Sequence, residues 1–236
     1  MPVKRLDRLA QNWRIDKARS FIAAGDRVLD IGCADGALFL RLGRLIGEGI
    51  GLDPDMTDRE VGPNFRLLKG MFPADLPDNR PFDVITMLAV LEHIPRDQQV
   101  GLAAACAESL ASGGRVIITV PSGAVDPIAN ALTTIGVAHG MSLEQHYGFK
   151  SSEAIPLFTG AGLELLARRR FQLGLNNLFV FRTARATVDK QGSAVSGSRD
   201  REGREDATLT AGQATSNSAE TGAWSSSRQV STPAAE

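Results

Sequence analysis

The sequence predicts an α/β fold: a doubly wound, mostly parallel sheet of seven strands with helices on both faces. Three observations support this prediction. Short β-rich segments alternate along the chain with segments whose apolar residues recur at helical spacing. A glycine-containing turn joins the first of these strands to the helix that follows it. The chain also has 236 residues, enough for one domain with a sizeable core and a tail.

The elements follow from local patterns taken in chain order. The strand segments are rich in β-branched and other apolar residues, and they cover residues 28–31, 49–52, 65–69, 82–88, 115–120, 163–171 and 178–182. The helical segments cover residues 1–24, 37–46, 97–110 and 151–161. Ser112-Gly113-Gly114 is expected to end the third helix. A long insertion, residues 122–150, follows the fifth strand.

The composition changes near Arg185. From residue 186 to residue 236, Ser, Gly, Thr, Ala and charged residues dominate, and apolar residues are isolated. Such a stretch buries too little surface to offset its chain entropy. We therefore expect a folded domain over residues 1–185 and a disordered tail over 186–236.

Composition also excludes several classes of protein. The formal net charge is -1, unlike the basic balance of a dedicated nucleic-acid binder. Cys33 and Cys106 form no CxxC pattern, which disfavours a disulfide framework or a zinc site. The first ten residues carry charges among their leucines and do not resemble a signal peptide, and no apolar run is long enough to span a bilayer. We expect a cytoplasmic location.

The segment from Asp30 to Gly36 predicts a ligand site. Gly32 and Gly36 let the backbone turn sharply before a helix N-terminus, whose N–H groups are unpaired. Their spacing differs from the dinucleotide fingerprint G-x-G-x-x-G, and the P-loop sequence is absent. Asp30 would repel a pyrophosphate but suits a ligand with an ammonium and a sulfonium. Asp53 ends the second strand, where a carboxylate can accept hydrogen bonds from ribose hydroxyls.

These features resemble the class I, Rossmann-like family of S-adenosylmethionine-dependent methyltransferases. Residues 30–36 resemble its first motif, with Ala34 at the middle glycine, and residues 82–94 and 110–121 resemble its fourth-strand and fifth-strand motifs. The resemblance implies S-adenosylmethionine as cofactor. It also implies the cofactor-binding residues, which are Asp30, Gly32, Cys33, Ala34, Gly36, Asp53, Met71, Phe72, Met87 and Leu88. Residues 70–73 depart from the family, which often has an acidic residue or asparagine there beside the adenine.

Two histidines are the candidate catalytic residues. His146 lies in the insertion, and a neutral imidazole there can accept a proton near neutral pH. His93 follows the fourth strand. Its two alternative roles are that of a positioning residue and that of a base. We expect methylation of a small polar molecule, such as a sugar or a secondary metabolite, without a nucleic-acid partner. The alternatives are an RNA or protein methyltransferase and a catalytically silent binding module. The sequence does not indicate an oligomeric state.

Overall fold

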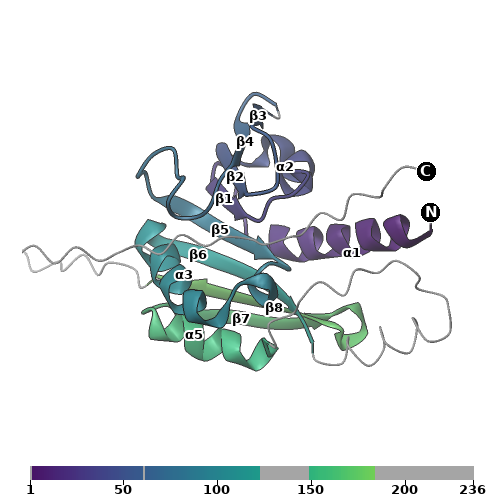
Figure 1. Ribbon diagram of the computed structural model, residues 1–236, viewed down its shortest axis with the longest axis vertical. Helices are drawn as coiled ribbons and strands as arrows, with labels where there is room; N and C mark the ends of the chain where they lie inside the picture. Colours follow the sequence, from purple (N-terminus) through teal and green to yellow (C-terminus); the bar gives the residue numbers. More distant parts are fainter. Residues whose placement is uncertain (1, 61, 123–148, 184–236) are drawn as a thin grey trace, which may run out of the picture. The chain divides into compact units, whose positions relative to one another are not determined.

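The computed structural model describes residues 2–60, 62–122 and 149–183 (Figure 1). The predicted tail and most of the predicted insertion, including His146, lie outside the described residues. The domain boundary at residue 185 therefore stays a prediction.

The described strands form one sheet in the order β3-β4-β2-β1-β5-β6-β8-β7. Their bounds are β1 Arg27–Ile31, β2 Glu48–Asp53, β3 Arg59–Glu60, β4 Phe65–Lys69, β5 Phe82–Leu88, β6 Leu110–Pro121, β7 Glu164–Phe171 and β8 Asn176–Arg182. β4, β2, β1, β5 and β6 are parallel, whereas β8 is antiparallel to both of its neighbours. The seven predicted strands are all present, and β3 is an addition that pairs antiparallel with β4. The predicted doubly wound, mostly parallel fold is confirmed.

Helices cover both faces of the sheet, as predicted (Figure 1). The helices are α1 Pro2–Arg19, α2 Ala37–Leu42, α3 Arg96–Ser109 and α5 Ala154–Gly160, and the short 3-10 turns are η1 Gly43–Leu45, η2 Leu91–His93, η3 Ser151–Glu153 and η4 Gln172–Gly174. α2 is shorter than predicted, because Gly43 adopts a φ of 55° that does not continue an α-helix. β6 begins directly after α3, earlier than predicted.

The core has two layers, one on each face of the sheet. Side chains alternate along each strand, so that neighbouring residues enter opposite layers. Leu29 and Phe179 pack with α3 and α5, whereas Val28 and Leu178 pack with α1 and α2. The central strands are therefore apolar throughout, as expected for a sheet covered on both faces.

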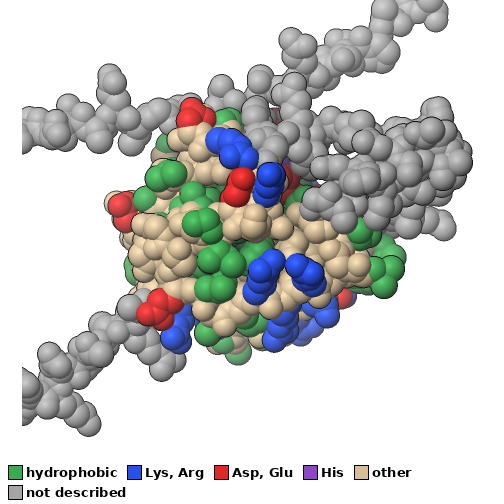
Figure 2. Space-filling model, turned by 90° about the horizontal axis from the view of Figure 1, so that it is seen from below, with side chains coloured by type: hydrophobic (Ala, Val, Ile, Leu, Met, Phe, Trp, Pro, Cys, Tyr) green, Lys and Arg blue, Asp and Glu red, His purple; other side chains and the backbone are tan. Residues whose placement is uncertain are grey.

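β7 forms one edge of the sheet and is largely exposed. Its run Arg168-Arg169-Arg170 lies on this edge. The Arg168 guanidinium is 5.4 Å from the ring centroid of Phe179. The Arg169 guanidinium is 4.7 Å from the ring centroid of Phe21. Figure 2 shows basic side chains in several groups, separated by apolar and uncharged surface. Among the described residues, no helix is both long and apolar enough to cross a membrane.

Candidate cofactor site

The turn between β1 and α2 has a tightly constrained backbone. Gly32, Ala34 and Gly36 have φ values of 71°, 45° and 73°, in the left-handed region that favours glycine. A Cβ at Gly32 would lie 2.5 Å from Val90 Cγ2, and one at Gly36 would lie 2.6 Å from Leu67 Cδ1. Both glycines are therefore required by backbone conformation and by packing, since protein atoms already occupy the space that a side chain would fill.

Asp53 holds this turn in place from the end of β2. Its Oδ2 accepts a hydrogen bond from Ala34 N at 3.0 Å, and its Oδ1 accepts one from Asp55 N at 2.9 Å. The side chain is 8% exposed. Each carboxylate oxygen has two lone-pair sites, so the group retains the capacity to accept further hydrogen bonds from a ligand.

Asp30 lies beside Asp53 and is almost fully buried. Thr86 Oγ1 donates to Asp30 Oδ1 at 2.6 Å and joins β5 to β1 through side chains. Burial raises the pKa of Asp30 to about 7; the hydrogen bond from Thr86 opposes this shift, and the charge of Asp53 adds to it. The negative charge of Asp53 thus disfavours ionisation of the buried Asp30, a cost that a cation would relieve.

Asp35 connects the turn to α1. Its carboxylate accepts hydrogen bonds from Arg8 Nη1 and, at 3.1 Å, from Gln11 Nε2. Partial burial raises the pKa of Asp35, but the hydrogen bonds from Arg8 and Gln11 outweigh this effect, and the pKa is lowered overall. The N-terminal half of α1 is therefore anchored on the turn.

The side chain of Cys33 points into the core. It is 4% exposed, and its Sγ lies 3.5 Å from Met56 Sδ. A Cβ built on Gly51 would come within 2.7 Å of the same sulfur. Burial raises the pKa of the thiol, so it stays protonated near neutral pH, and any contact of Cys33 with a cofactor would use its backbone.

The other predicted cofactor-binding residues differ in exposure. Phe72 and Met87 are buried in the core layer under α3 and α5, whereas Met71 and Leu88 are half-buried. The Met71 N–H donates to Asp75 Oδ2 at 2.8 Å. An acidic side chain thus lies beside this segment although residues 70–73 contain none, because the chain folds back to bring Asp75 to Met71.

His93 ends η2 at the carboxyl edge of the sheet and is half-buried. The structure does not describe His146, so the two candidate histidines cannot be placed together. Within the described part of the chain, His, Cys, Asp and Glu side chains form no cluster of three that could hold a metal ion.

Two side chains of this site were not predicted to belong to it. Thr86 interrupts an apolar strand, and Asp35 stands inside the glycine turn, yet neither position reveals its partner in the sequence. For Thr86, the signal in the sequence was a polar residue within a strand otherwise expected to be buried.

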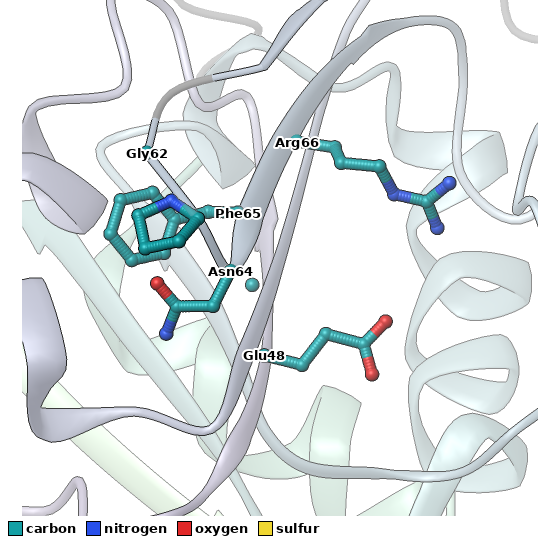
Figure 3. A pocket seen from close by; sticks show the side chains of 7 residues that line it. Glu48, Gly62, Asn64, Phe65 and Arg66 are labelled. Carbon is teal, nitrogen blue, oxygen red and sulfur yellow. The ribbon is translucent and has the colours of Figure 1, made fainter.

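A separate hollow lies at the opposite edge of the sheet, at the amino ends of β2 and β4 (Figure 3). Glu48 lines it together with Asn64, Phe65 and Arg66. The Glu48 carboxylate already pairs with Arg27 at 3.0 Å and with Arg80 at 2.7 Å. Since ligands of doubly wound sheets bind at the carboxyl ends of the strands, this hollow is not the cofactor site.

Solved structures with a similar fold include methyltransferases. The chain resembles magnesium protoporphyrin IX methyltransferase from Synechocystis PCC 6803, solved with bound SAH (TM-score 0.56, 16% identity, 75% of this chain and 84% of that one). It also resembles a methyltransferase from Haloferax volcanii, solved in complex with the Trm112 methyltransferase activator (TM-score 0.55, 18% identity, 74% and 91%). At these identities, the likeness confirms the fold.

Sequence comparison extends the likeness to curated relatives. Ubiquinone biosynthesis O-methyltransferase of Stutzerimonas stutzeri is 29% identical over 153 residues, and that of Nitrosococcus oceani is 32% identical over 129 residues. These matches cover 60% and 51% of this chain, and 62% and 53% of the relatives. The chain thus spans less than two thirds of the length of either relative.

The family itself is defined by a broader match. The model of a methyltransferase-domain family matches residues 4–175, which include the turn, Asp53 and every described strand up to β7. The resemblance drawn from the motifs is confirmed, and with it the cofactor class. The chain belongs to the methyltransferase-domain family, in the class I group that uses S-adenosylmethionine.

Proposed function

We propose that this protein transfers a methyl group from S-adenosylmethionine to an oxygen atom of a small polar molecule. The turn from Gly32 to Gly36, held by Asp53, is the observation that carries the proposal. The choice of oxygen follows the two relatives, whose names specify O-methylation. Sugars and secondary metabolites are the acceptor classes that we favour over nucleic acid, because the net charge of the chain is close to zero.

The charges of the site fit this cofactor. When bound, S-adenosylmethionine supplies an electrophilic methyl group on a sulfonium and carries a second positive charge on its ammonium. Asp30 and Asp53 are both buried, and the negative charge of Asp53 disfavours ionisation of Asp30. A cationic ligand relieves this repulsion, whereas a pyrophosphate would increase it. We assign Asp53 to the ribose hydroxyls and Asp30 to the positively charged end.

The protein's part in the reaction is orientation and proton removal. The acceptor oxygen forms a bond to the methyl carbon while the carbon–sulfur bond breaks and its electron pair returns to sulfur. The hydroxyl proton must leave, and we assign His146 as the base that takes it. His93, which follows β5 at the carboxyl edge, is assigned a positioning role.

Two measurements test the proposal. Isothermal titration with S-adenosylmethionine should give a 1:1 complex, and a radiolabelled methyl-transfer assay against fractionated cell metabolites should label a small molecule. Asp16→Ala is the matched control for carboxylate removal, since the described structure shows Asp16 paired with exposed Arg41 on the surface. A protein that fails to bind the cofactor would refute the proposed function.

A further inference from the structure

Buried oxygen atoms without a hydrogen-bond partner gather at the carboxyl edge of the sheet. Within the part of the chain that the structure describes, they are Glu92 Oε2 after β5, Gln98 Oε1 in the first turn of α3, Thr119 Oγ1 and Ser122 Oγ at the end of β6, and Asn176 Oδ1 at the start of β8. Buried polar atoms are nearly always paired in folded proteins, and a group of unpaired ones needs an explanation. This edge is also the one that carries the cofactor turn.

Thr119 and Asn176 point to the same side of the sheet. Thr119 stands two residues from Ile117, and Asn176 stands two residues from Leu178; both of these apolar side chains lie in the core layer under α1 and α2. Because strand side chains alternate, Thr119 and Asn176 face that side as well. Thr119 also pairs in register with Leu88 of β5, which brings it next to the predicted cofactor residues.

The N-terminal half of α1 covers this polar region. Asn176 Nδ2 donates to Gln172 Oε1, and Gln172 Nε2 donates to the Ala10 carbonyl at 3.3 Å. Ile15 of α1 is buried in the same core layer as Leu178. The helix therefore lies over the region and is linked to it by a chain of hydrogen bonds.

Glu92 lies beside the cofactor turn. It is 3% exposed, and it belongs to η2, which begins directly after Val90. Val90 packs so closely on Gly32 that a Cβ there would come within 2.5 Å of it. Burial raises the pKa of Glu92 to about 7, and the positive charge of Arg14 on α1 opposes this shift. Glu92 thus stands two residues after Val90, which packs on the turn, and its carboxyl group is within electrostatic reach of Arg14 on α1.

We propose that Glu92, Thr119 and Asn176 bind the methyl acceptor, and that the acceptor is a small, neutral molecule with at least two hydroxyl groups. This inference rests on the proposed function and specifies its substrate class. The amide oxygen of Asn176 can only accept a hydrogen bond, and the carboxyl group of Glu92 also only accepts above its pKa of about 7. Above that pH, the ligand must supply the donors. Because Thr119 is fully buried, the atoms that cover it must move to admit the ligand.

The charges around Glu92 favour hydroxyl donors over an ammonium. The positive charge of Arg14 already acts on the carboxyl group, and the cofactor brings its own positive charges to the neighbouring turn. A further cation at this point would be repelled by both. Neutral hydroxyl groups satisfy the unpaired oxygens without that cost.

Two conservative variants separate ligand binding from a structural role. Thr119→Val replaces an unpaired buried hydroxyl by a methyl group of the same shape, so the melting temperature should stay unchanged or rise. Thr86→Val is the contrasting variant, because Thr86 donates to Asp30 and its loss should lower the melting temperature. Thr159→Val, on the exposed side of α5, serves as the neutral control.

Acceptor binding is measured directly by saturation-transfer NMR in the presence of S-adenosylhomocysteine. The probes are catechol and myo-inositol as neutral polyols, 1,2-dimethoxybenzene as the skeleton without donors, and benzylamine as the cation. We expect catechol or myo-inositol to bind to the wild-type protein and to bind at least tenfold more weakly to Thr119→Val and Glu92→Gln. The affinity of both variants for S-adenosylhomocysteine should equal that of the wild type. The acceptor assignment is wrong if neither catechol nor myo-inositol binds, or if the variants bind the one that does as tightly as the wild type. It is also wrong if 1,2-dimethoxybenzene or benzylamine binds as tightly as that probe. Each of these results leaves the cofactor assignment standing. If the wild-type protein does not bind S-adenosylhomocysteine or S-adenosylmethionine at all, the proposed function fails.

Discussion

Replacing Asp53 by alanine tests the cofactor assignment most directly. The substitution removes the acceptor of the Ala34 and Asp55 N–H groups and, by our assignment, that of the two ribose hydroxyls. Hydrogen bonds to a charged group contribute about 1.5–3 kcal/mol. The affinity for S-adenosylmethionine should therefore fall roughly ten- to hundredfold.

The same substitution has a separate effect on stability. Ala34 and Asp55 are exposed, so water can replace the lost acceptor, and the cost should be about 1–2 kcal/mol. For a domain of this size, that corresponds to a fall in Tm of roughly 2–8 °C. The variant should remain folded, which allows its affinity to be interpreted.

Isothermal titration on the folded variant, checked by circular dichroism, measures the predicted loss. Asp53→Asn retains one carbonyl oxygen and should bind with intermediate affinity, and Asp16→Ala should bind like the wild type. Unchanged affinity in a folded Asp53→Ala protein would refute the ribose assignment.

Four further outcomes are expected. By our assignment the positively charged end of the cofactor requires ionised Asp30, whose pKa is about 7 against an ordinary value of 3.8. Affinity for S-adenosylmethionine should therefore fall as pH drops below about 7, by up to roughly tenfold per unit. A flat titration profile between pH 5.5 and 7.5 would contradict this. The same raised pKa means that the folded state binds the extra proton, so the contribution of Asp30 to stability should decline as pH rises from about 4 to 7 and then level off. Deleting residues 186–236 should leave Tm and cofactor affinity nearly unchanged, because the segment lacks the apolar periodicity needed to pack. A clear drop in Tm would show that the segment docks on the domain. His146→Ala should lower turnover roughly 10²–10⁴-fold at constant cofactor affinity, and His93→Ala should lower it less. Wild-type turnover in His146→Ala would exclude His146 as the general base.

The fold was predictable where the hydrophobic pattern is continuous. The strands at 65–69 and 82–88 have the predicted bounds. β3 was missed because two residues show no periodicity. Ser112-Gly113-Gly114 was expected to separate a helix from a strand but lies inside β6; a Cβ at Gly114 would approach Phe82 O to 3.0 Å, so the glycine permits close contact between two strands.

The site was predictable only where its residues are contiguous or end a strand. Gly32, Gly36 and Asp53 stand at positions that topology alone brings to one edge of a parallel sheet. The links from Thr86 to Asp30 and from Arg8 to Asp35 depend on how β5 and α1 pack, which spacing along the chain does not reveal. The unpaired state of Thr119 is likewise a property of its surroundings rather than of its residue type.

The arginine run on β7 affects how copies of this protein can associate. Among the described strands, β7 pairs with β8 alone, so its outer backbone groups face away from the sheet. Two copies that joined antiparallel through this edge in a register centred on Arg169 would place Arg168–Arg170 of one strand opposite the same run of the other. Like charges directly opposite destabilise a strand pair, and the irregular register between Leu165 and Ala167 further interrupts a regular edge. Growth of the sheet from copy to copy is therefore disfavoured at this edge, and neutral residues in the run would remove the electrostatic barrier to aggregation.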